Sequence, residues 1–195
     1  MSAIPKPKLT PAEYLVRERS AEFKSEYFQG EMIERARASK EHVIIATNLL
    51  GELHQALKGS PYRVCSSDQR LKVSRTDFYA YPDLAIVSDK AVYDPLDEET
   101  LLNPITIIEI LSPETETFDR SAKFRQYQQI PSLSEYILVS QNVPVCERFV
   151  RRPDEGWNLT FVTALTGELA FTSVPVRIPL TMIYDGVEFP PETLR

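Results

Sequence analysis

Residues 105–111 decide the fold, and they read ITIIEIL. Five of these seven residues are β-branched and only one is charged. A short, nearly continuous apolar run of this kind is typical of a strand that is covered on both faces. We therefore predict a central strand here. Glu109 stands inside it, and a carboxylate in a buried strand is unfavourable unless it is protonated, paired with a cation or bound to a metal.

Working outward from this strand, the sequence predicts two main helices. Ser39 caps a run with apolar residues at helical spacing, which Gly59 ends at about residue 58. A second helix is predicted over residues 113–129, where Pro131 stops it. Short helices are expected over residues 10–20 and 180–184, a hairpin over 26–34, and strands over 62–65, 71–73, 84–87, 136–140, 146–151 and 159–163.

This order of elements predicts a single α/β domain over residues 1–195, built on one main mixed α+β sheet flanked by helices. A chain of 195 residues can bury one good core but is too short for two comfortable domains. Residues 1–9 are expected to be a flexible lead-in. Residues 89–103 are acidic and rich in turn-forming residues, so we expect a surface loop there.

Composition limits the classes of function. The chain has 22 Lys and Arg against 28 Asp and Glu, a formal net charge of −6. Proteins that bind DNA without sequence preference are usually basic, so this charge argues against tight non-specific binding. No apolar run is long enough to span a bilayer, and the N-terminus lacks the apolar segment of a signal peptide. Cys65 and Cys146 stand in no metal-binding pattern, so we expect free thiols in a reducing cytoplasm.

Asp83 and Glu109 are candidate metal ligands. Asp83 follows Pro82 and directly precedes the apolar run of residues 84–87. Two carboxylates on adjacent strands could hold one hard divalent cation through oxygen ligands. Such a cation would generate the nucleophile of a hydrolysis and offset charge in its transition state. Taken singly, Asp83 is more often a turn or strand-start residue, and Glu109 could equally form a buried salt bridge with an arginine.

Lys123 strengthens the metal-site interpretation. It shares a face of the second predicted helix with Tyr127 and Ile130 and should face the sheet, whereas Arg125 points elsewhere. Beside two carboxylates, a lysine can orient or help to activate an attacking water and stabilise developing negative charge. In isolation, a lysine whose stem packs on apolar surface would be the preferred interpretation.

These residues also carry a family resemblance. The matching motifs are Tyr81-Pro82-Asp83, Ile108-Glu109-Ile110-Leu111-Ser112-Pro113, Lys123 with Tyr127, and Glu135-Tyr136. As a set they resemble the Uma-two-type restriction endonuclease family of the PD-(D/E)XK nuclease superfamily. The resemblance covers roughly residues 10–187 and implies a restriction-endonuclease-like core, with a central mixed β-sheet flanked by helices.

The resemblance also implies roles for the candidate residues. Asp83 corresponds to the metal-binding aspartate of the PD element, and Glu109 to the acidic member of the (D/E)XK element. The sequence departs from the standard pattern at Leu111, where that element has its lysine. In this family the lysine is thought to have moved to the following helix, which fits Lys123.

Two further residues are candidate auxiliaries. The resemblance makes His42 credible as a residue that orients the metal site. It makes Glu31 an outside candidate for an auxiliary acid. From the residues alone, His42 is more often a satisfied core histidine and Glu31 a turn residue. The chain has no GxxxxGK[ST], GxGxxG or HExxH motif, which argues against the nucleotide-binding and zinc-hydrolase classes.

The leading hypothesis is therefore an endonuclease that hydrolyses DNA phosphodiester bonds with Mg²⁺, for which Mn²⁺ could substitute. The alternative is a catalytically inactive binding or assembly module that retains the fold, which the acidic net charge and the displaced lysine modestly favour. No membrane partner is expected. The resemblance implies a homodimer; Phe161, Phe171 and Phe189 could serve its interface, although core packing explains them equally well.

Overall fold

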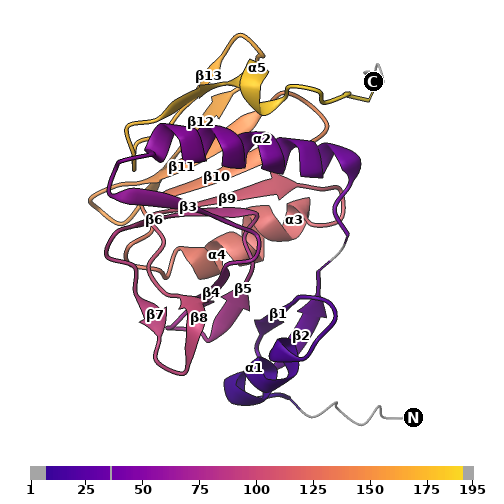
Figure 1. Cartoon of the computed structure of the whole chain (residues 1–195), viewed down its shortest axis with the longest axis vertical. Helices are drawn as coiled ribbons and strands as arrows, with labels where there is room; N and C mark the ends of the chain where they lie inside the picture. The colour runs from indigo at the N-terminus through magenta and orange to yellow at the C-terminus, as the bar shows by residue number, and fades with distance from the viewer. Residues whose placement is uncertain (1–7, 36, 191–195) are drawn as a thin grey trace.

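The computed structural model describes residues 8–35 and 37–190, so residues 1–7 of the predicted lead-in lie outside the described part. Two six-stranded sheets and a two-stranded ribbon form the fold, with helices packed on both large sheets (Figure 1). The expectation of a single main sheet is wrong, because the described residues form two six-stranded sheets. In the described part of the chain, no helix is both long and apolar enough to cross a membrane.

The central sheet has the strand order β12-β11-β10-β9-β6-β3. Its inner strand β9 runs parallel to β10 and antiparallel to β6, and every residue of β9 is buried. This confirms the central strand predicted from ITIIEIL. The bounds are β3 Tyr62–Ser66, β6 Leu84–Ser88, β9 Thr106–Leu111, β10 Glu135–Ser140, β11 Cys146–Arg151 and β12 Trp157–Val162.

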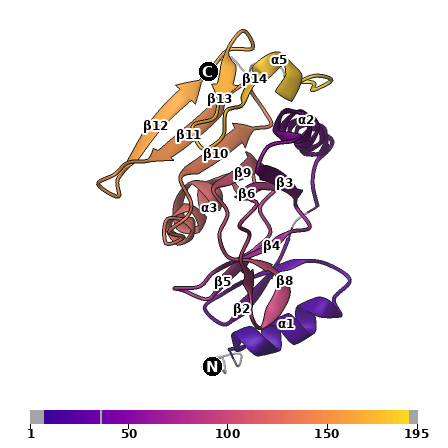
Figure 2. The ribbon, with the colours of Figure 1, turned by 60° about the vertical axis from the view of Figure 1, so that its left-hand side comes forward.

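The two faces of β9 pack against different helices, which lie on opposite sides of the sheet (Figure 2). Ile108 joins the core under α2 (Lys40–Leu57), which Ser39 caps as predicted. Ile107 joins a second core that includes residues of α4 (Phe124–Tyr127). Because side chains alternate along a strand, Glu109 shares the α4 face with Ile107. The Glu109 carboxylate therefore lies on the α4 side of the sheet.

The helical segment after β9 begins later than predicted and is irregular. Its parts are α3 (Glu116–Phe118), the π-helical turn η1 (Asp119–Lys123) and α4. A π turn inserts one residue into the helix, and such turns occur frequently at functional sites. Here both Asp119 and Lys123 are buried. The burial predicted for Lys123 is confirmed.

The second sheet has the order β2-β1-β5-β4-β8-β7, and α1 (Pro11–Arg19) packs on it through Tyr14. The predicted hairpin forms β1 and β2. The surface loop expected over residues 89–103 is wrong, because β7 and β8 lie there. The bounds are β1 Ser25–Phe28, β2 Glu31–Glu34, β4 Arg70–Val73, β5 Phe78–Ala80, β7 Tyr93–Asp94 and β8 Asp97–Leu101.

Buried ion pairs explain why this acidic segment is ordered. Arg70 pairs with Asp97, and the Lys72 Nζ lies 2.9 Å from Asp94 Oδ2. Both carboxylates are almost fully buried. We call these four residues the Arg70–Asp97 network. Acidic residues usually face solvent, but here Asp94 and Asp97 each pair with a cation from β4, and Asp97 also pairs with Arg19 of α1.

The last described elements lie on the α2 side of the central sheet. The ribbon of β13 (Glu168–Ala170) and β14 (Arg177–Pro179) leads into α5 (Leu180–Ile183), whose Ile183 joins the α2 core. The Asn48 side chain on α2 donates to the Ile183 carbonyl oxygen at 3.0 Å. Both cysteines are free thiols, as predicted.

Candidate metal site

Asp83 and Glu109 are joined across two segments of the central sheet. Asp83 lies immediately before β6, and the register pairs Leu84 with Ile108 on β9. The Asp83 Oδ2 accepts the Ile110 backbone N–H at 2.8 Å, and the Asp83 N–H reaches Glu109 Oε2 at 3.3 Å. These reciprocal hydrogen bonds hold the two carboxylates side by side. The predicted pair is therefore present.

Lys123 completes the predicted trio. Its Nζ lies 3.0 Å from Glu109 Oε1, which also accepts a hydrogen bond from the Tyr127 hydroxyl at 2.9 Å. The same Nζ lies 2.9 Å from Glu26 on β1 and 3.4 Å from Asp119 in the π turn. Lys123 is thus surrounded by three carboxylates from three different elements. A buried ammonium requires such pairing.

The other face of Asp83 is covered by two basic side chains. The Arg35 Nη2 lies 2.9 Å from Asp83 Oδ1, and the His42 Nε2 lies 3.2 Å from the same oxygen. The Asp83 side chain is 5% exposed, whereas those of Arg35 and His42 are 25% and 15% exposed. Arg35 and His42 therefore lie between the carboxylate and solvent. His42, a candidate auxiliary residue, thus contacts Asp83 directly.

We call the following group the carboxylate cluster: Glu26, Asp83, Glu109, Asp119, Arg35 and Lys123. Its four carboxylates outnumber its two permanent cations, so full ionisation would leave two negative charges without a cation. Burial raises the pKa of Glu109; Lys123 opposes this shift, and the charge of Asp83 adds to it. Burial also opposes ionisation of Asp83, but His42 and Arg35 outweigh it and lower its pKa.

Glu31 does not join the cluster. It begins β2, its side chain is exposed, and in residues 8–35 and 37–190 no hydrogen bond or ion pair links that side chain to the predicted trio. Three members were not predicted: Glu26, Arg35 and Asp119. Of these, only Asp119 carried a signal, because it precedes Lys123 by four residues and so shares its helix face.

The carboxylate pair fits a cation that keeps most of its own water. Within the described residues, no group of three or more His, Cys, Asp or Glu side chains is arranged to hold a metal. Mg²⁺ is commonly held by one or two carboxylates, with water and substrate phosphate completing its octahedron. Asp83 and Glu109 offer this hard-oxygen set, and the carboxylates of the cluster outnumber its cations. The residues thus fit Mg²⁺ and do not form an all-protein cage.

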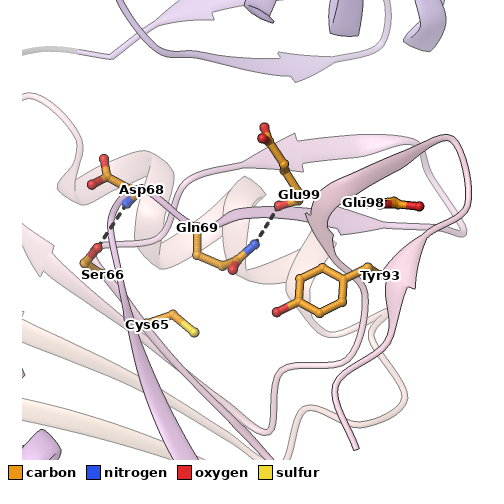
Figure 3. A pocket seen from close by; sticks show the side chains of 7 residues that line it. All are labelled: Cys65, Ser66, Asp68, Gln69, Tyr93, Glu98 and Glu99. Carbon is orange, nitrogen blue, oxygen red and sulfur yellow. Dashed lines mark hydrogen bonds between the residues drawn. The ribbon is translucent and has the colours of Figure 1, made fainter.

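A surface hollow lies away from the carboxylate cluster. About 610 Å³ in volume, it lies between the turn after β3 and the β7–β8 hairpin, and Figure 3 shows the side chains around it. Asp68, Glu98 and Glu99 line it together with Cys65 and Tyr93. Three carboxylates would repel a phosphate, and no residue of the carboxylate cluster lines it. The hollow is therefore a poor substrate site for a nuclease.

Comparison with known proteins identifies the family of this chain. A family model described as "Uma2: Putative restriction endonuclease" matches residues 11–181. The chain belongs to the Uma2 family. Family membership confirms the resemblance found in the sequence and supports nuclease activity.

Two relatives in Synechocystis sp. (strain ATCC 27184 / PCC 6803 / Kazusa) are uncharacterized proteins. The protein sll1609 is 34% identical over 168 residues, 86% of this Uma2 chain and 95% of its own. The protein slr1290 is 31% identical over 185 residues, 95% of this chain and 96% of its own. Both similarities therefore cover nearly the full length of the related protein.

The fold also has a solved counterpart. It is the crystal structure of "a putative nuclease belonging to DUF820" from Anabaena variabilis, with a TM-score of 0.74 and 15% identity. The match covers 90% of this Uma2 chain and 97% of that chain. At this identity the likeness shows the fold alone. The predicted restriction-endonuclease-like fold, with its mixed α+β sheet, is confirmed.

Proposed function

We propose that this Uma2 protein is a metal-dependent endonuclease that hydrolyses DNA phosphodiester bonds, with Mg²⁺ held by Asp83 and Glu109. The observation that carries the proposal is the convergence of Asp83, Glu109 and Lys123 from three separate segments. Each side chain is at least nine-tenths buried. Burying three charged groups together is unfavourable for stability alone, so a site with a chemical task is the better account.

The bound cation would lower the pKa of its water and offset charge on the phosphate. Asp83 and Glu109 would fix its position, because backbone hydrogen bonds link their two segments. Burial disfavours a charged Lys123, but the neighbouring carboxylates outweigh it and raise its pKa well above the usual value. Without a divalent cation, Lys123 therefore stays protonated. We propose that it acts by orienting water and stabilising negative charge.

Thermal unfolding with and without Mg²⁺ or Mn²⁺ tests the proposal. At ten times the dissociation constant, a single bound ion adds about 1.4 kcal/mol to the free energy of unfolding, about 3–6 °C in melting temperature. Asp83→Asn should lose this rise. Asp97→Asn is the matched control, since both aspartates are 5% exposed and Asp97 lies outside the cluster.

A cleavage assay on plasmid DNA then separates the enzyme from the inactive module. Parent protein should cut with Mg²⁺, and Asp83→Ala and Glu109→Ala should not. Their circular dichroism spectra should match the parent, which excludes unfolding as the cause. If neither cation raises the melting temperature and no DNA is cut, the binding or assembly module replaces our proposal.

We also propose a homodimer formed through β12. It is an edge strand of the central sheet (Figure 2), and on it Leu159 and Phe161 are 42% and 56% exposed. Phe171 and Phe189 instead pack with the α2 core. β12 carries no charge or proline, the usual features that keep edge strands from pairing. Phe161→Lys should yield monomers by sedimentation at concentrations where the parent dimerises; a monomeric parent contradicts the dimer.

The remaining predictions from the sequence concern cell location and substrate. The cytoplasmic location and the preference for DNA over RNA stay predictions of this proposal. Cleavage of matched DNA and RNA duplexes, in the same buffer with Mg²⁺, measures the second.

A further inference from the structure

Arg35 contacts the carboxylate oxygen that a metal ion would need. Of the two oxygens of Asp83, Oδ2 is engaged by the Ile110 N–H, whereas Oδ1 receives the Arg35 Nη2 at 2.9 Å. His42 reaches Oδ1 as well, at 3.2 Å. A guanidinium and a divalent cation cannot share one oxygen without strong mutual repulsion. Arg35 and the cation therefore exclude one another at Asp83.

Arg35 is also the charged group of the cluster with the best access to solvent. Its side chain is 25% exposed, whereas that of Lys123 is 5% exposed and tied to three carboxylates. The residue directly follows β2, and its backbone N–H donates to the Lys24 carbonyl oxygen at 3.0 Å, so its backbone is held while its long side chain can rotate. Once released from Asp83, the guanidinium can turn outward and stay beside the carboxylate pair.

At a nuclease site, a guanidinium released from Asp83 would have a substrate phosphate to bind. Its planar fork of N–H donors matches two oxygens of a phosphate, an arrangement that a lysine ammonium cannot reproduce. In a chain of net charge −6, a cation next to the cluster would lower the repulsion that a nucleic-acid strand meets there. We propose that Arg35 holds the cation's place on Asp83 and moves to a substrate phosphate when the cation binds.

This inference rests on the proposed metal site and predicts an exchange at Asp83. Removing Arg35 should strengthen metal binding, because the competitor is gone. A merely structural role for Arg35 predicts the opposite, since a damaged site binds metal less well.

Calorimetric titration with Mg²⁺ measures the first half of the exchange. Arg35→Gln should bind Mg²⁺ about tenfold more tightly than the parent, which is within the usual range of coupling between two ligands. Arg37→Gln is the matched control, because it removes the same charge two residues away at an exposed position. Within the described residues, Arg37 forms no ion pair with Asp83. The control should differ from the parent by less than about twofold.

Each outcome of the titration decides a different question. Equal or weaker Mg²⁺ binding by Arg35→Gln overturns the inference and leaves the metal site standing. If no protein, parent included, binds Mg²⁺, both the inference and the proposed metal dependence are wrong. Arg35→Lys keeps the charge and removes the fork, so its Mg²⁺ affinity should lie between those of the parent and Arg35→Gln.

Binding of a labelled DNA duplex measures the second half. Ca²⁺, which takes the same oxygen ligands at longer distances, serves as the cation, and salt dependence is followed by fluorescence anisotropy. With Ca²⁺, Arg35→Gln should lower the slope of log affinity against log salt by about 1, the loss of one phosphate contact. Without divalent cation, its slope should equal that of the parent, because Arg35 then stays on Asp83. A change of slope that is the same in both conditions, or absent in both, overturns the inference.

Discussion

Two buried groups of charges in this protein differ in their balance. In the Arg70–Asp97 network, two aspartates face two cations of β4. In the carboxylate cluster, four carboxylates face Arg35 and Lys123. Burial is similar in both, since Asp97 and Asp83 are each 5% exposed. The solvent exposure of these two aspartates is therefore the same, while the balance of charge around them differs.

The pKa shifts follow this difference. Burial opposes ionisation of Asp97 and Asp94, but their hydrogen-bonded partners outweigh it and lower the pKa of both. In the cluster, burial and excess negative charge raise the pKa of Glu109. A balanced network contributes to stability, whereas an unbalanced cluster lowers it and is suited to accept a further cation. Buried charge alone does not mark a functional site; buried charge without compensation does.

The largest expected effect comes from breaking the balanced network. Arg70→Met leaves the buried Asp97 with the half-exposed Arg19 as its remaining ion-pair partner and should lower the free energy of unfolding by about 3–5 kcal/mol. Urea unfolding at neutral pH measures it. The double variant Arg70→Met/Asp97→Leu should recover most of the loss. A loss of under about 1 kcal/mol in the single variant would show that the network is weaker than its burial indicates.

Neutralising one carboxylate in each group compares them directly. Asp97→Asn should lower the free energy of unfolding by about 1.5–3 kcal/mol, because Arg70 loses a charged hydrogen-bond partner. Without divalent cation, Glu109→Gln should cost under about 1 kcal/mol or stabilise, since it removes excess negative charge. Both are measured by urea unfolding in chelator. A larger loss from Glu109→Gln than from Asp97→Asn contradicts the proposed difference.

Acid should weaken the balanced network. The folded-state pKa of Asp94 and Asp97 lies below its ordinary value. Their contribution to stability is therefore complete above a pH of about 4 and is lost as pH falls toward the lowered pKa. Melting temperatures from pH 5 to pH 3 should fall less steeply for Asp97→Asn than for the parent. Parallel curves for the two proteins would contradict this account.

The smallest expected effect is at Glu31, the auxiliary acid suggested by the family resemblance. Its exposed side chain lies outside the cluster. Glu31→Gln should change the free energy of unfolding by less than about 0.5 kcal/mol. Calorimetry should show an Mg²⁺ affinity within about twofold of the parent's. A tenfold loss would show that Glu31 reaches the metal site after all.

The sequence predicted the parts of the fold that local periodicity controls. The strand of residues 105–111, α2 and the inward face of Lys123 are confirmed because apolar spacing determines each of them. Residues 89–103 are misinterpreted because acidic residues normally face solvent, and the burial of Asp94 and Asp97 depends on the distant Arg19, Arg70 and Lys72. Ion pairs between segments far apart in the chain leave no periodic signal.

The candidate site likewise contains residues that the sequence could predict and residues that it could not. Asp83, Glu109 and Lys123 interrupt apolar patterns or continue a helix face, so the sequence could predict them. Glu26 lies in the short β1–β2 hairpin, and Arg35 directly follows it. The sequence pattern of this hairpin does not indicate which residues its side chains contact. Their place depends on how the second sheet packs against the helix after β9, which is a property of the whole fold.

The π turn at Asp119–Lys123 gives the helix after β9 one residue more than a regular helix would need. Successive residues of an α-helix are rotated by about 100° about its axis. A deletion of Ser121 would therefore turn Tyr127 away from Glu109 or carry Asp119 out of reach of Lys123. The number of residues in this turn therefore sets the directions in which Asp119, Lys123 and Tyr127 point relative to one another. Length variation at this turn would be far more damaging than most single substitutions within it.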